Sequence, residues 1–328
     1  MRKYGMRDIH TVADLFCGTG AVSCMFADIP GITYVWSNDI EPYAVTLTKA
    51  RLSPPVNAES MLQKYNAKAA GLVVKMGFTG GWIVKHHAIE DSKGRQTFPK
   101  QAAVMLDALD AVVPLSNVYA RASLLEAILR SSNGMGALNS ALHAKYSPNV
   151  TPKLLPLSPV SNNKIRHRVT CLDSAFISIN KQFDVIYIDP PYTRSSDYTR
   201  QYNLLNTIIL RDNPAVVGKY NVRKDAKTSS FSLRSKCDSA FKNLIRECAG
   251  KCRYICISYA LYALIRIDRI HQLLTEHNFN NIKTYTCTLP TYGAPLTAAY
   301  EIMIIASHDP QTECKPLSSQ CVSRLRKS

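Results

Sequence analysis

The stretch FDVIYIDPPY, residues 183–192, brings a carboxylate, two prolines and an aromatic ring together at one point of the chain. The apolar, β-rich run Val185–Ile188 predicts a buried strand, which must end here because neither proline can donate to a strand ladder. Each proline also favours extended geometry in the residue before it, so the corner is stiff. It presents Asp189, bare carbonyl oxygens and the Tyr192 ring at the carboxyl edge of a strand, where open α/β sheets bind ligands. The simpler alternative is a proline-rich turn that only closes a core strand.

A second run that could do chemistry is VADLFCGTGAVSCMFA, residues 12–27. An apolar strand over Val12–Cys17 meets the turn Gly18-Thr19-Gly20, and a helical pattern follows. Glycines let the backbone turn tightly and approach a ligand, and a helix amino terminus offers N–H groups to it. The dinucleotide pattern GxGxxG is not matched, because position 23 is Ser, and this disfavours NAD. A βα turn without any ligand is the simpler alternative.

Acids stand at the ends of successive predicted strands. Two further strands, Thr33–Trp36 and a run near Val169–Leu172, are each followed by an acid. In a parallel sheet such acids face one crevice. Asp39, about 20 residues beyond the glycines, suits an acceptor for a ribose diol, and it suits equally the N-cap of the next helix. The acids in question are Asp14, Asp39, Asp173 and Asp189.

The chain as a whole is strongly basic. Its 328 residues carry 40 Lys+Arg against 24 Asp+Glu, a net charge of +16, which predicts a polyanionic partner and above all nucleic acid. No stretch approaches ~18 uncharged apolar residues and no apolar signal-peptide core is present, so we expect neither a membrane span nor secretion. The ten cysteines form no CxxC pair, and Cys248, Cys252 and Cys256 lack an iron–sulfur spacing. We therefore expect reduced thiols, a cytoplasmic protein and no metal site.

The α/β rhythm that must position these motifs is interrupted from Ser53 to about Lys164. This segment contains amphipathic helical runs over Gln101–Val113 and Ala120–Arg130 and ends in a proline-rich linker. We expect a mainly helical insertion between two halves of an α/β sheet. The predicted division is a domain made of residues 1–52 and 165–309, the insertion 53–164, and a basic tail 310–328 that we expect to be disordered.

Together these runs resemble the Dam-like, alpha-group DNA adenine-N6 methyltransferases of type II modification systems. The resemblance rests on the order DLFCGTG (14–20), long insertion, DPPY (189–192), and it covers most of residues 12–60 and 166–306. It implies a Rossmann-like, S-adenosylmethionine-dependent methyltransferase sheet whose insertion is a target-recognition domain. The family usually opens with a Gly-Ser-Lys-type segment and a helix. Here the counterpart of that opening is at most Lys3–Arg7, with Asp14 seven residues later, a departure that concerns the grip on the methionine end of the cofactor.

The resemblance also implies roles for individual residues. In the catalytic corner, Asp189 and the carbonyl of Pro190 would hold the N6 amine of a flipped adenine, beside Pro191, while Tyr192 stacks on the base. S-adenosylmethionine would lie along the glycine loop, with Asp39 on its ribose. The implied cofactor-binding residues are Asp14, Phe16, Cys17, Gly18, Gly20, Asp39, Ile40, Asp173 and Ser174. The segment 193–236 is long, polar and basic, which by itself favours a lid that contacts DNA, with a solvated loop as the simpler alternative. The expected DNA contacts are Arg194, Tyr198, Arg200, Tyr202, Lys219 and Arg223.

The predicted function is site-specific methylation of adenine N6 in double-stranded DNA, by a modification enzyme of a restriction–modification system or an orphan methylase. We expect a monomer, and any cognate restriction endonuclease would act on the same sequence without stable association. Two alternatives stay open: methylation of cytosine N4 in DNA or of adenine in RNA, and an inactive DNA-binding relative. An Asp at the head of the corner favours adenine, since Ser-Pro-Pro is commoner for cytosine N4. The retained Asp189, Tyr192 and glycines argue against decay.

Overall fold

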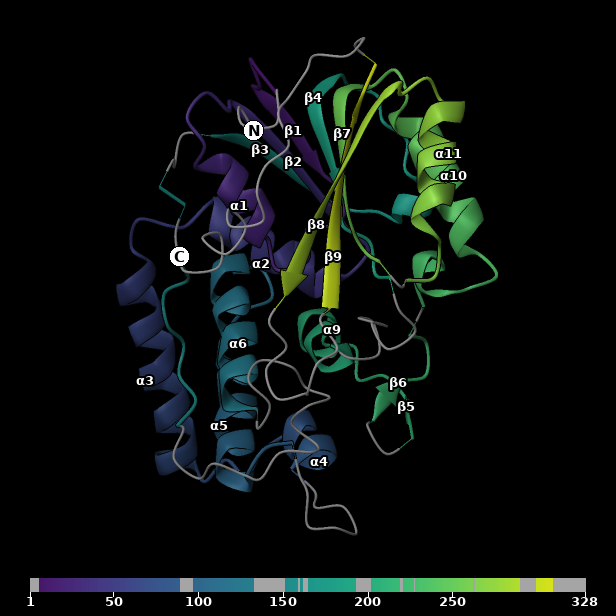
Figure 1. Ribbon diagram of the computed structural model, residues 1–328. Coiled ribbons are helices and arrows are strands. Elements are labelled where there is room, and N and C mark those ends of the chain that lie inside the picture. Colours follow the sequence, from purple (N-terminus) through teal and green to yellow (C-terminus); the bar gives the residue numbers. More distant parts are fainter. Residues whose placement is uncertain are drawn as a thin grey trace.

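We describe the fold from a computed structural model of the chain. The described residues are 6–88, 97–132, 151–158, 160–161, 165–192, 202–218, 221–226, 228–261, 263–289 and 299–308. Within them, seven strands form one sheet in the order β3-β2-β1-β4-β7-β9-β8 (Figure 1). The first five of these strands are parallel, and β9 runs antiparallel to both β7 and β8. The strands are β1 (Thr11–Asp14), β2 (Tyr34–Asp39), β3 (Arg166–Cys171), β4 (Phe183–Ile188), β7 (Cys252–Ala260), β8 (Asn281–Leu289) and β9 (Ala299–Ser307).

Helices cover both faces of the sheet, and alternate strand residues supply the two cores. Val12 and Val185 pack toward α1 on one face, whereas Ala13 and Ile186 pack toward α10 and α11 on the other. This two-residue period is what a strand buried on both faces produces. The covering helices are α1 (Ala21–Ala27), α2 (Pro42–Leu52), α10 (Cys237–Cys248) and α11 (Ile267–Glu276), and two 3-10 turns, η2 (Ser174–Phe176) and η4 (Ser230–Ser232), lie between them in the chain.

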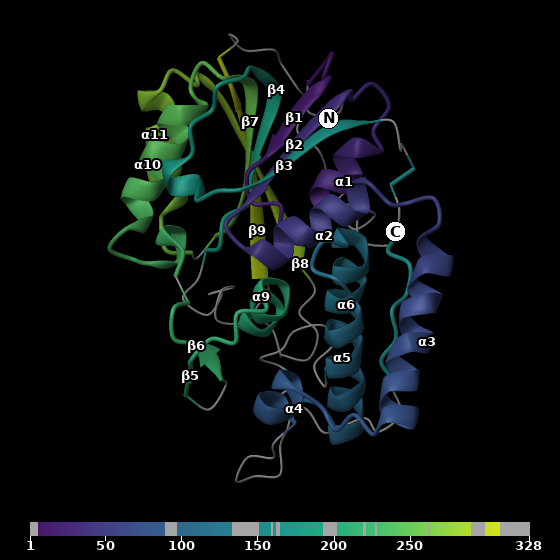
Figure 2. The same cartoon turned by 180° about the vertical axis from the view of Figure 1, so that it is seen from behind.

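A second, helical core lies beyond the carboxyl edge of the sheet, where α3, α5 and α6 run side by side (Figures 1 and 2). Its only fully buried arginine among the described residues, Arg121, is 1% exposed and pairs with Asp110 at 2.6 Å, joining α6 to α5. The elements are α3 (Ala58–Met76), α4 (Trp82–His87), α5 (Lys100–Val112), α6 (Val118–Ser131) and α9 (Asn203–Leu210), beside a small ribbon of β5 (Val216–Val217) and β6 (Val222–Arg223).

The predicted fold class is confirmed: a mainly parallel α/β sheet is interrupted by a mainly helical segment. The two helical runs expected in this segment correspond to α5 and α6. The 19-residue α3 was not predicted; it fully buries only Leu62 and Ala69. None of the described helices has both the length and the apolar character needed to cross a bilayer. The tail 310–328 lies outside the described residues.

Candidate active site

The carboxyl edge of the sheet gathers the four acids, as the sequence predicts. Asp14 ends β1 and pairs in register with Tyr187 of β4, two residues before Asp189. On the other side of β1, β2 ends at Asp39, which pairs with Cys171 of β3, two residues before Asp173. Because β3, β2, β1 and β4 are neighbours in the sheet, the acids meet at one edge.

The glycine loop between β1 and α1 has a geometry that only glycine fits easily. Gly20 has φ 84°, and a Cβ there would lie 2.7 Å from the Thr48 hydroxyl oxygen. Gly18 has φ 50°, and its N–H donates to Asp39 Oδ2 at 2.8 Å. The other oxygen of this carboxylate accepts the N–H of Glu41 at 2.9 Å. Asp39 therefore ties the loop to the start of α2, whose N-cap residue is Glu41 and not Asp39.

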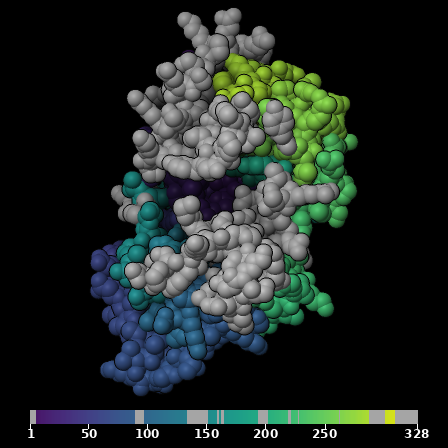
Figure 3. Space-filling model, turned by 60° about the horizontal axis from the view of Figure 1, so that its bottom comes forward, coloured from purple at the N-terminus to yellow at the C-terminus, as the bar shows by residue number. Residues whose placement is uncertain are grey.

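A pocket of about 450 Å³ opens between the glycine loop and the Asp-Pro-Pro-Tyr corner. This volume lies within the range of small-molecule sites. Seen from the lower end of the molecule, purple amino-terminal atoms lie recessed between the blue inserted helices and the green carboxy-terminal part (Figure 3). No Lys or Arg is found among the described residues that line the pocket, although the chain is basic. The acidic side chains in its lining are Asp39, Glu41, Asp173, Asp189 and Glu301.

Burial raises the pKa of three carboxylates at this edge, Asp14, Asp39 and Asp189, so all three are hard to ionise. Burial raises the pKa of Asp14 to about 7, against the hydrogen bond that the Ser23 hydroxyl donates at 2.7 Å. Its Oδ1 has no hydrogen-bond partner among the described residues. Burial likewise raises the pKa of Asp189 to about 6, and the Glu301 carboxylate adds to the rise. Strongly shifted acids in a pocket are typical of functional sites.

The Tyr192 ring is held from two directions. It meets the ring of Tyr259 edge-on, with centroids 5.7 Å apart and planes at 77°. Its hydroxyl donates to Glu301 Oε1 at 3.5 Å, and its backbone carbonyl accepts the N–H of Leu264 at 3.3 Å. Edge-to-face aromatic contacts favour defined ring orientations. The ring is therefore oriented by β7, β9 and the loop after β7.

A chain of edge-to-face aromatic rings joins the glycine loop to the corner. Phe16 of the loop meets Phe231 at 5.0 Å, and Phe231 meets Phe241 at 5.3 Å. Phe241 then contacts Tyr259 at 5.3 Å, which in turn contacts Tyr192. The three middle rings are fully buried. The two motifs that the sequence places 170 residues apart thus share one rigid support.

Most of the predicted site residues meet at this pocket. Asp14 and Gly20 lie beneath the lining: Asp14 is fully buried, and Gly20 caps α1. Ser174 lies in the lining, but its hydroxyl donates to the Leu15 carbonyl at 2.7 Å, so it also braces the strand end. The predicted residues that line the pocket are Phe16, Cys17, Gly18, Asp39, Ile40, Asp173, Ser174, Asp189, Pro190, Pro191, Tyr192 and Tyr202.

Of the residues expected to contact nucleic acid, Tyr202 lines the pocket, where its ring packs 5.4 Å from Tyr43. Arg223 lies elsewhere. It is 6% exposed, and its guanidinium binds Asp212 at 2.6 Å and Asp225 at 2.9 Å. A cation so enclosed holds the protein's own loops, so we withdraw it from the expected DNA contacts. Arg194, Tyr198, Arg200 and Lys219 lie outside the described residues.

Several pocket residues were not predicted. Glu301 could have been found, because the apolar run AAYEIMIIA, residues 298–306, predicts a strand that carries one acid near its start. Leu129 of α6 and Ser229 before η4 carry no local motif, and only the packing of distant segments brings them to the pocket. In the described part of the chain, no cluster of three or more His, Cys, Asp or Glu side chains could hold a metal ion.

Comparison with known proteins identifies the family. Residues 3–259 match the D12 class of N6 adenine-specific DNA methyltransferases. The chain is 24% identical over 334 residues to the modification methylase LlaI of Lactococcus lactis subsp. lactis, covering 94% of this chain and 52% of that protein. It is 25% identical over 273 residues to the type II methyltransferase M.NlaIII of Neisseria lactamica, covering 79% and 78%. A third relative is the type II methyltransferase M.FokI of Planomicrobium okeanokoites, 26% identical over 291 residues that cover 82% of this chain and 43% of that protein.

The chain thus spans about half the length of the LlaI methylase and less than half of M.FokI. Among solved structures, a SAM-dependent methyltransferase from Methanosarcina mazei aligns at 10% identity with a TM-score of 0.35, covering 93% of this chain and 95% of that one. So low a score adds nothing to the topology already described. The family match extends over more than half of the sequence, from the glycine loop through the Asp-Pro-Pro-Tyr corner to β7. The chain belongs to the D12 class of N6 adenine-specific DNA methyltransferases.

Proposed function

We propose that this chain transfers a methyl group from S-adenosylmethionine to N6 of an adenine flipped out of double-stranded DNA. The observation that carries the proposal is Asp189, a half-buried carboxylate at the head of a stiff corner, which lines the same pocket as the glycine loop. Family membership supplies the reaction class. The catalytic part would be residues 1–52 and 165–309, with the insertion 53–164 reading the target sequence.

The pocket suits the methyl donor by its charge. S-adenosylmethionine carries a sulfonium and an ammonium against one carboxylate, and it supplies a methyl group bound to positive sulfur. Acids without a Lys or Arg beside them in the described lining favour such a cation. Asp14 lies beneath the same loop, where its carboxylate would favour a positively charged group nearby. Asp39 and Asp173 would hold the ribose and the adenine amine, and Phe16 and Gly18 would hold the remainder.

Asp189 would activate the adenine amine without a covalent intermediate. The N6 lone pair is delocalised into the ring, so the nitrogen is a poor nucleophile until its hydrogens are held out of plane. The Asp189 carboxylate accepts one N–H and the Pro190 carbonyl accepts the other, where positive charge develops on nitrogen. The bound donor would supply the methyl carbon, with the electron pair of the broken carbon–sulfur bond left on sulfur. N6 then loses a proton, which Asp189, with a pKa raised to about 6, is able to accept.

Tyr192 would hold the base outside the duplex. Methyl transfer cannot reach N6 inside a base-paired stack, so the adenine must be extruded at a cost of a few kcal/mol. One stacking contact of ~1–3 kcal/mol together with two hydrogen bonds can offset that cost. Tyr202, which also lines the pocket, is a second candidate contact to the base. Arg194, Tyr198, Arg200 and Lys219 stay predictions as DNA contacts.

The net charge of +16 supports binding to the DNA backbone. The relatives named as modification and type II methyltransferases favour a role beside a restriction endonuclease, although an orphan methylase fits equally. We further propose that the chain acts as a monomer and forms no stable complex with such an endonuclease. Because methylation marks only the DNA, the two enzymes need share a target sequence and no interface.

Tritiated S-adenosylmethionine tests the proposal. Unmethylated plasmid DNA and a transcript of the same sequence are incubated with the wild-type chain and with Asp189→Ala. We expect label in DNA, none in RNA, and at least a 100-fold lower rate for Asp189→Ala. Label in RNA alone would select the RNA alternative. Binding to DNA without label would select the inactive relative.

A further inference from the structure

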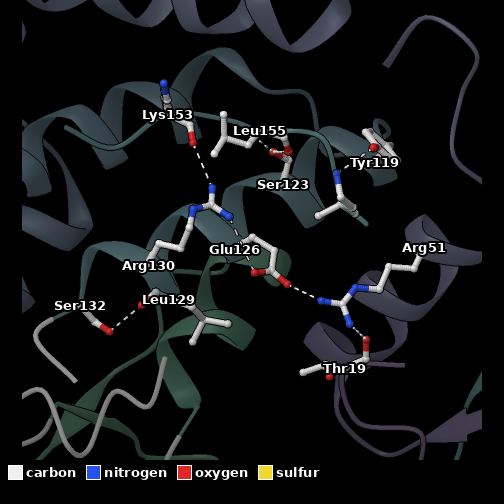
Figure 4. Close-up of polar contacts among 11 residues, drawn as sticks. Thr19, Arg51, Tyr119, Ser123, Glu126, Leu129, Arg130, Ser132, Lys153 and Leu155 are labelled. Atoms are coloured by element: carbon white, nitrogen blue, oxygen red, sulfur yellow. Dashed lines mark hydrogen bonds and ion pairs between the residues drawn. The ribbon is translucent and has the colours of Figure 1, made fainter. Parts of the chain in front are cut away.

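Arg51 of α2 bridges the glycine loop and the inserted helix α6. Its Nη1 donates to the Thr19 carbonyl at 2.7 Å, and its Nη2 donates to Glu126 Oε1 at 2.6 Å (Figure 4). The side chains of Arg51 and Glu126 are 20% and 21% exposed, so solvent screens the pair only in part. Thr19 itself lines the pocket. One guanidinium thus fixes a loop carbonyl at the pocket and is fixed in turn by the insertion.

The loop needs an external brace at this point. Gly18 and Gly20, on either side of Thr19, both have positive φ. Glycine adopts positive and negative φ about equally well, so these residues do not fix the loop conformation by themselves. The Gly18 N–H is held by Asp39 and the Gly20 N–H by the Cys17 carbonyl at 2.7 Å. Between them, the Thr19 carbonyl is held by Arg51. A short, charged hydrogen bond is one of the stronger restraints a side chain can place on a backbone group.

Glu126 stands on a helix that cannot easily move. The hydroxyl of Ser123 donates to the Leu155 carbonyl at 2.7 Å, and the Tyr119 hydroxyl accepts the N–H of Leu157 at 3.0 Å (Figure 4). Arg130 donates to the Lys153 carbonyl at 3.2 Å. The return segment of the insertion therefore pins α6 along its length, and Glu126 presents its carboxylate from a fixed position. A side chain held this way can orient its partner.

Helix α6 also reaches the pocket directly. Leu129, three residues after Glu126, lines it, and residues three apart on a helix share one face. The same face thus supplies an apolar wall and, through Arg51, the brace on the loop. Neither Leu129 nor Glu126 belongs to a motif that marks part of a site in the sequence.

We infer that Arg51 and Glu126 are positioning residues for the methyl-donor site, so that helix α6 of the target-recognition insertion is also part of cofactor binding. The inference rests on the proposed function, because it assigns these residues to the same donor pocket. It makes the insertion more than a DNA reader: a change on α6 alters affinity for the donor in the absence of DNA. Glu126 acts on the loop only through Arg51.

Calorimetric titration of the full chain with S-adenosylhomocysteine, without DNA, tests this. We expect Glu126→Gln to weaken binding roughly tenfold, which corresponds to about 1.4 kcal/mol, while the thermal midpoint of the unliganded protein stays within a few degrees. The matched control is Glu276→Gln. It removes the same kind of charge from an Arg–Glu pair, 3.3 Å from Arg269 within α11, and neither residue lines the pocket or contacts the glycine loop in the described structure, so affinity should not change.

A double-mutant cycle separates a brace from a general packing effect. In an Arg51→Met background, Glu126→Gln should cost no further affinity, and Arg51→Lys, which can reach only one of the two partners, should be intermediate. Wild-type affinity in Glu126→Gln, or an undiminished loss in the Arg51→Met background, would overturn the inference and leave the proposed function standing. A wild-type chain that binds no S-adenosylhomocysteine and no S-adenosylmethionine would overturn both.

Discussion

The two ends of strand β4 carry the same side chain in opposite surroundings. At the amino end, Asp184 Oδ2 accepts the backbone N–H groups of His10 and Thr11, each at 2.9 Å, and Oδ1 faces Arg253 at 3.4 Å. Burial alone would raise the pKa of Asp184, but these donors bring it below its ordinary value. At the carboxyl end, Asp189 is approached by hydroxyl groups and by another carboxylate, and its pKa is raised to about 6.

The difference separates structural acids from functional ones within five residues of one strand. A carboxylate supplied with N–H donors and a cation stabilises the fold, whereas a buried carboxylate without a cation costs stability. Buried carboxylates without a cation are typical of functional sites, where a ligand provides the missing partners. Asp14, one strand away, belongs to the second kind. At the carboxyl edge Asp14 and Asp189 thus lack, among the described residues, enough N–H donors or a cation to offset their burial, whereas Asp184 at the amino edge has both.

Asp189→Ala should break the chemistry and leave the fold intact. We expect methyl transfer to fall at least 100-fold, because the acceptor for the amine hydrogen is lost. The free energy of unfolding should be unchanged or higher, since a destabilised charge is removed. Initial rates with tritiated donor and urea unfolding of the same preparation measure the two effects. Lost activity caused by unfolding would contradict the assignment.

Asp184→Ala should lower the stability of the fold and leave methyl transfer intact. Losing its hydrogen bonds leaves the His10 and Thr11 N–H groups unpaired, and we expect a loss of about 2 kcal/mol in the free energy of unfolding at pH 7. Since the folded pKa of Asp184 is lowered, this contribution is present above the unfolded pKa and fades as the pH falls below about 4. Methyl transfer per folded molecule should stay near wild type. A loss of methyl-transfer rate as large as that of Asp189→Ala would contradict the assignment of Asp184 as a purely structural acid.

Asp14→Asn should stabilise the protein. With a folded pKa of about 7 against 3.8, ionising Asp14 costs stability as the pH rises between these values, and the cost is full above pH 7. The amide removes the charge and keeps an acceptor for Ser23, so we expect a gain of about 1 kcal/mol at pH 8 and none near pH 4. Donor affinity should fall in the same variant. Urea unfolding at the two pH values measures the change. A loss of stability at pH 8 would show that Asp14, like Asp184, stabilises the fold.

Glu301→Gln should have the smallest effect on the rate of methyl transfer, and it tests directly what sets the pKa of Asp189. The groups facing Asp189 are Tyr187, Ser258, Asp14 and Glu301. Methyl transfer should decline as the pH falls through about 6, where Asp189 takes up a proton. Removing the Glu301 charge lowers the pKa of Asp189, so the acid limb of the rate profile should move to lower pH by less than one unit. A move to higher pH would contradict this electrostatic picture.

Much of the site could be predicted because its motifs are local. In the Asp189 corner and the glycine loop, a few neighbouring residues predict the backbone geometry: prolines, glycines and an abrupt end to an apolar strand. The acids at strand ends followed once a parallel sheet was assumed, and the register of β3, β2, β1 and β4 bears that out.

The rest depends on contacts between distant segments. Arg223 looked like a DNA contact because it is basic and lies in a polar stretch, and only its two partners, Asp212 and Asp225, show otherwise. Leu129 reaches the pocket because α6 packs against α2, about 75 residues earlier in the chain, which no periodicity encodes. The helix α3 escaped notice because most of its surface faces solvent.

Mass spectrometry of nucleosides tests the central claim most directly. Unmethylated plasmid DNA is incubated with S-adenosylmethionine and the wild-type chain, then digested to nucleosides, with Asp189→Ala as the matched control. The account predicts N6-methyladenine with the wild-type chain and at least a 100-fold slower appearance with the variant. N4-methylcytosine in place of N6-methyladenine, or no methylated base from a chain that binds both donor and DNA, would contradict it.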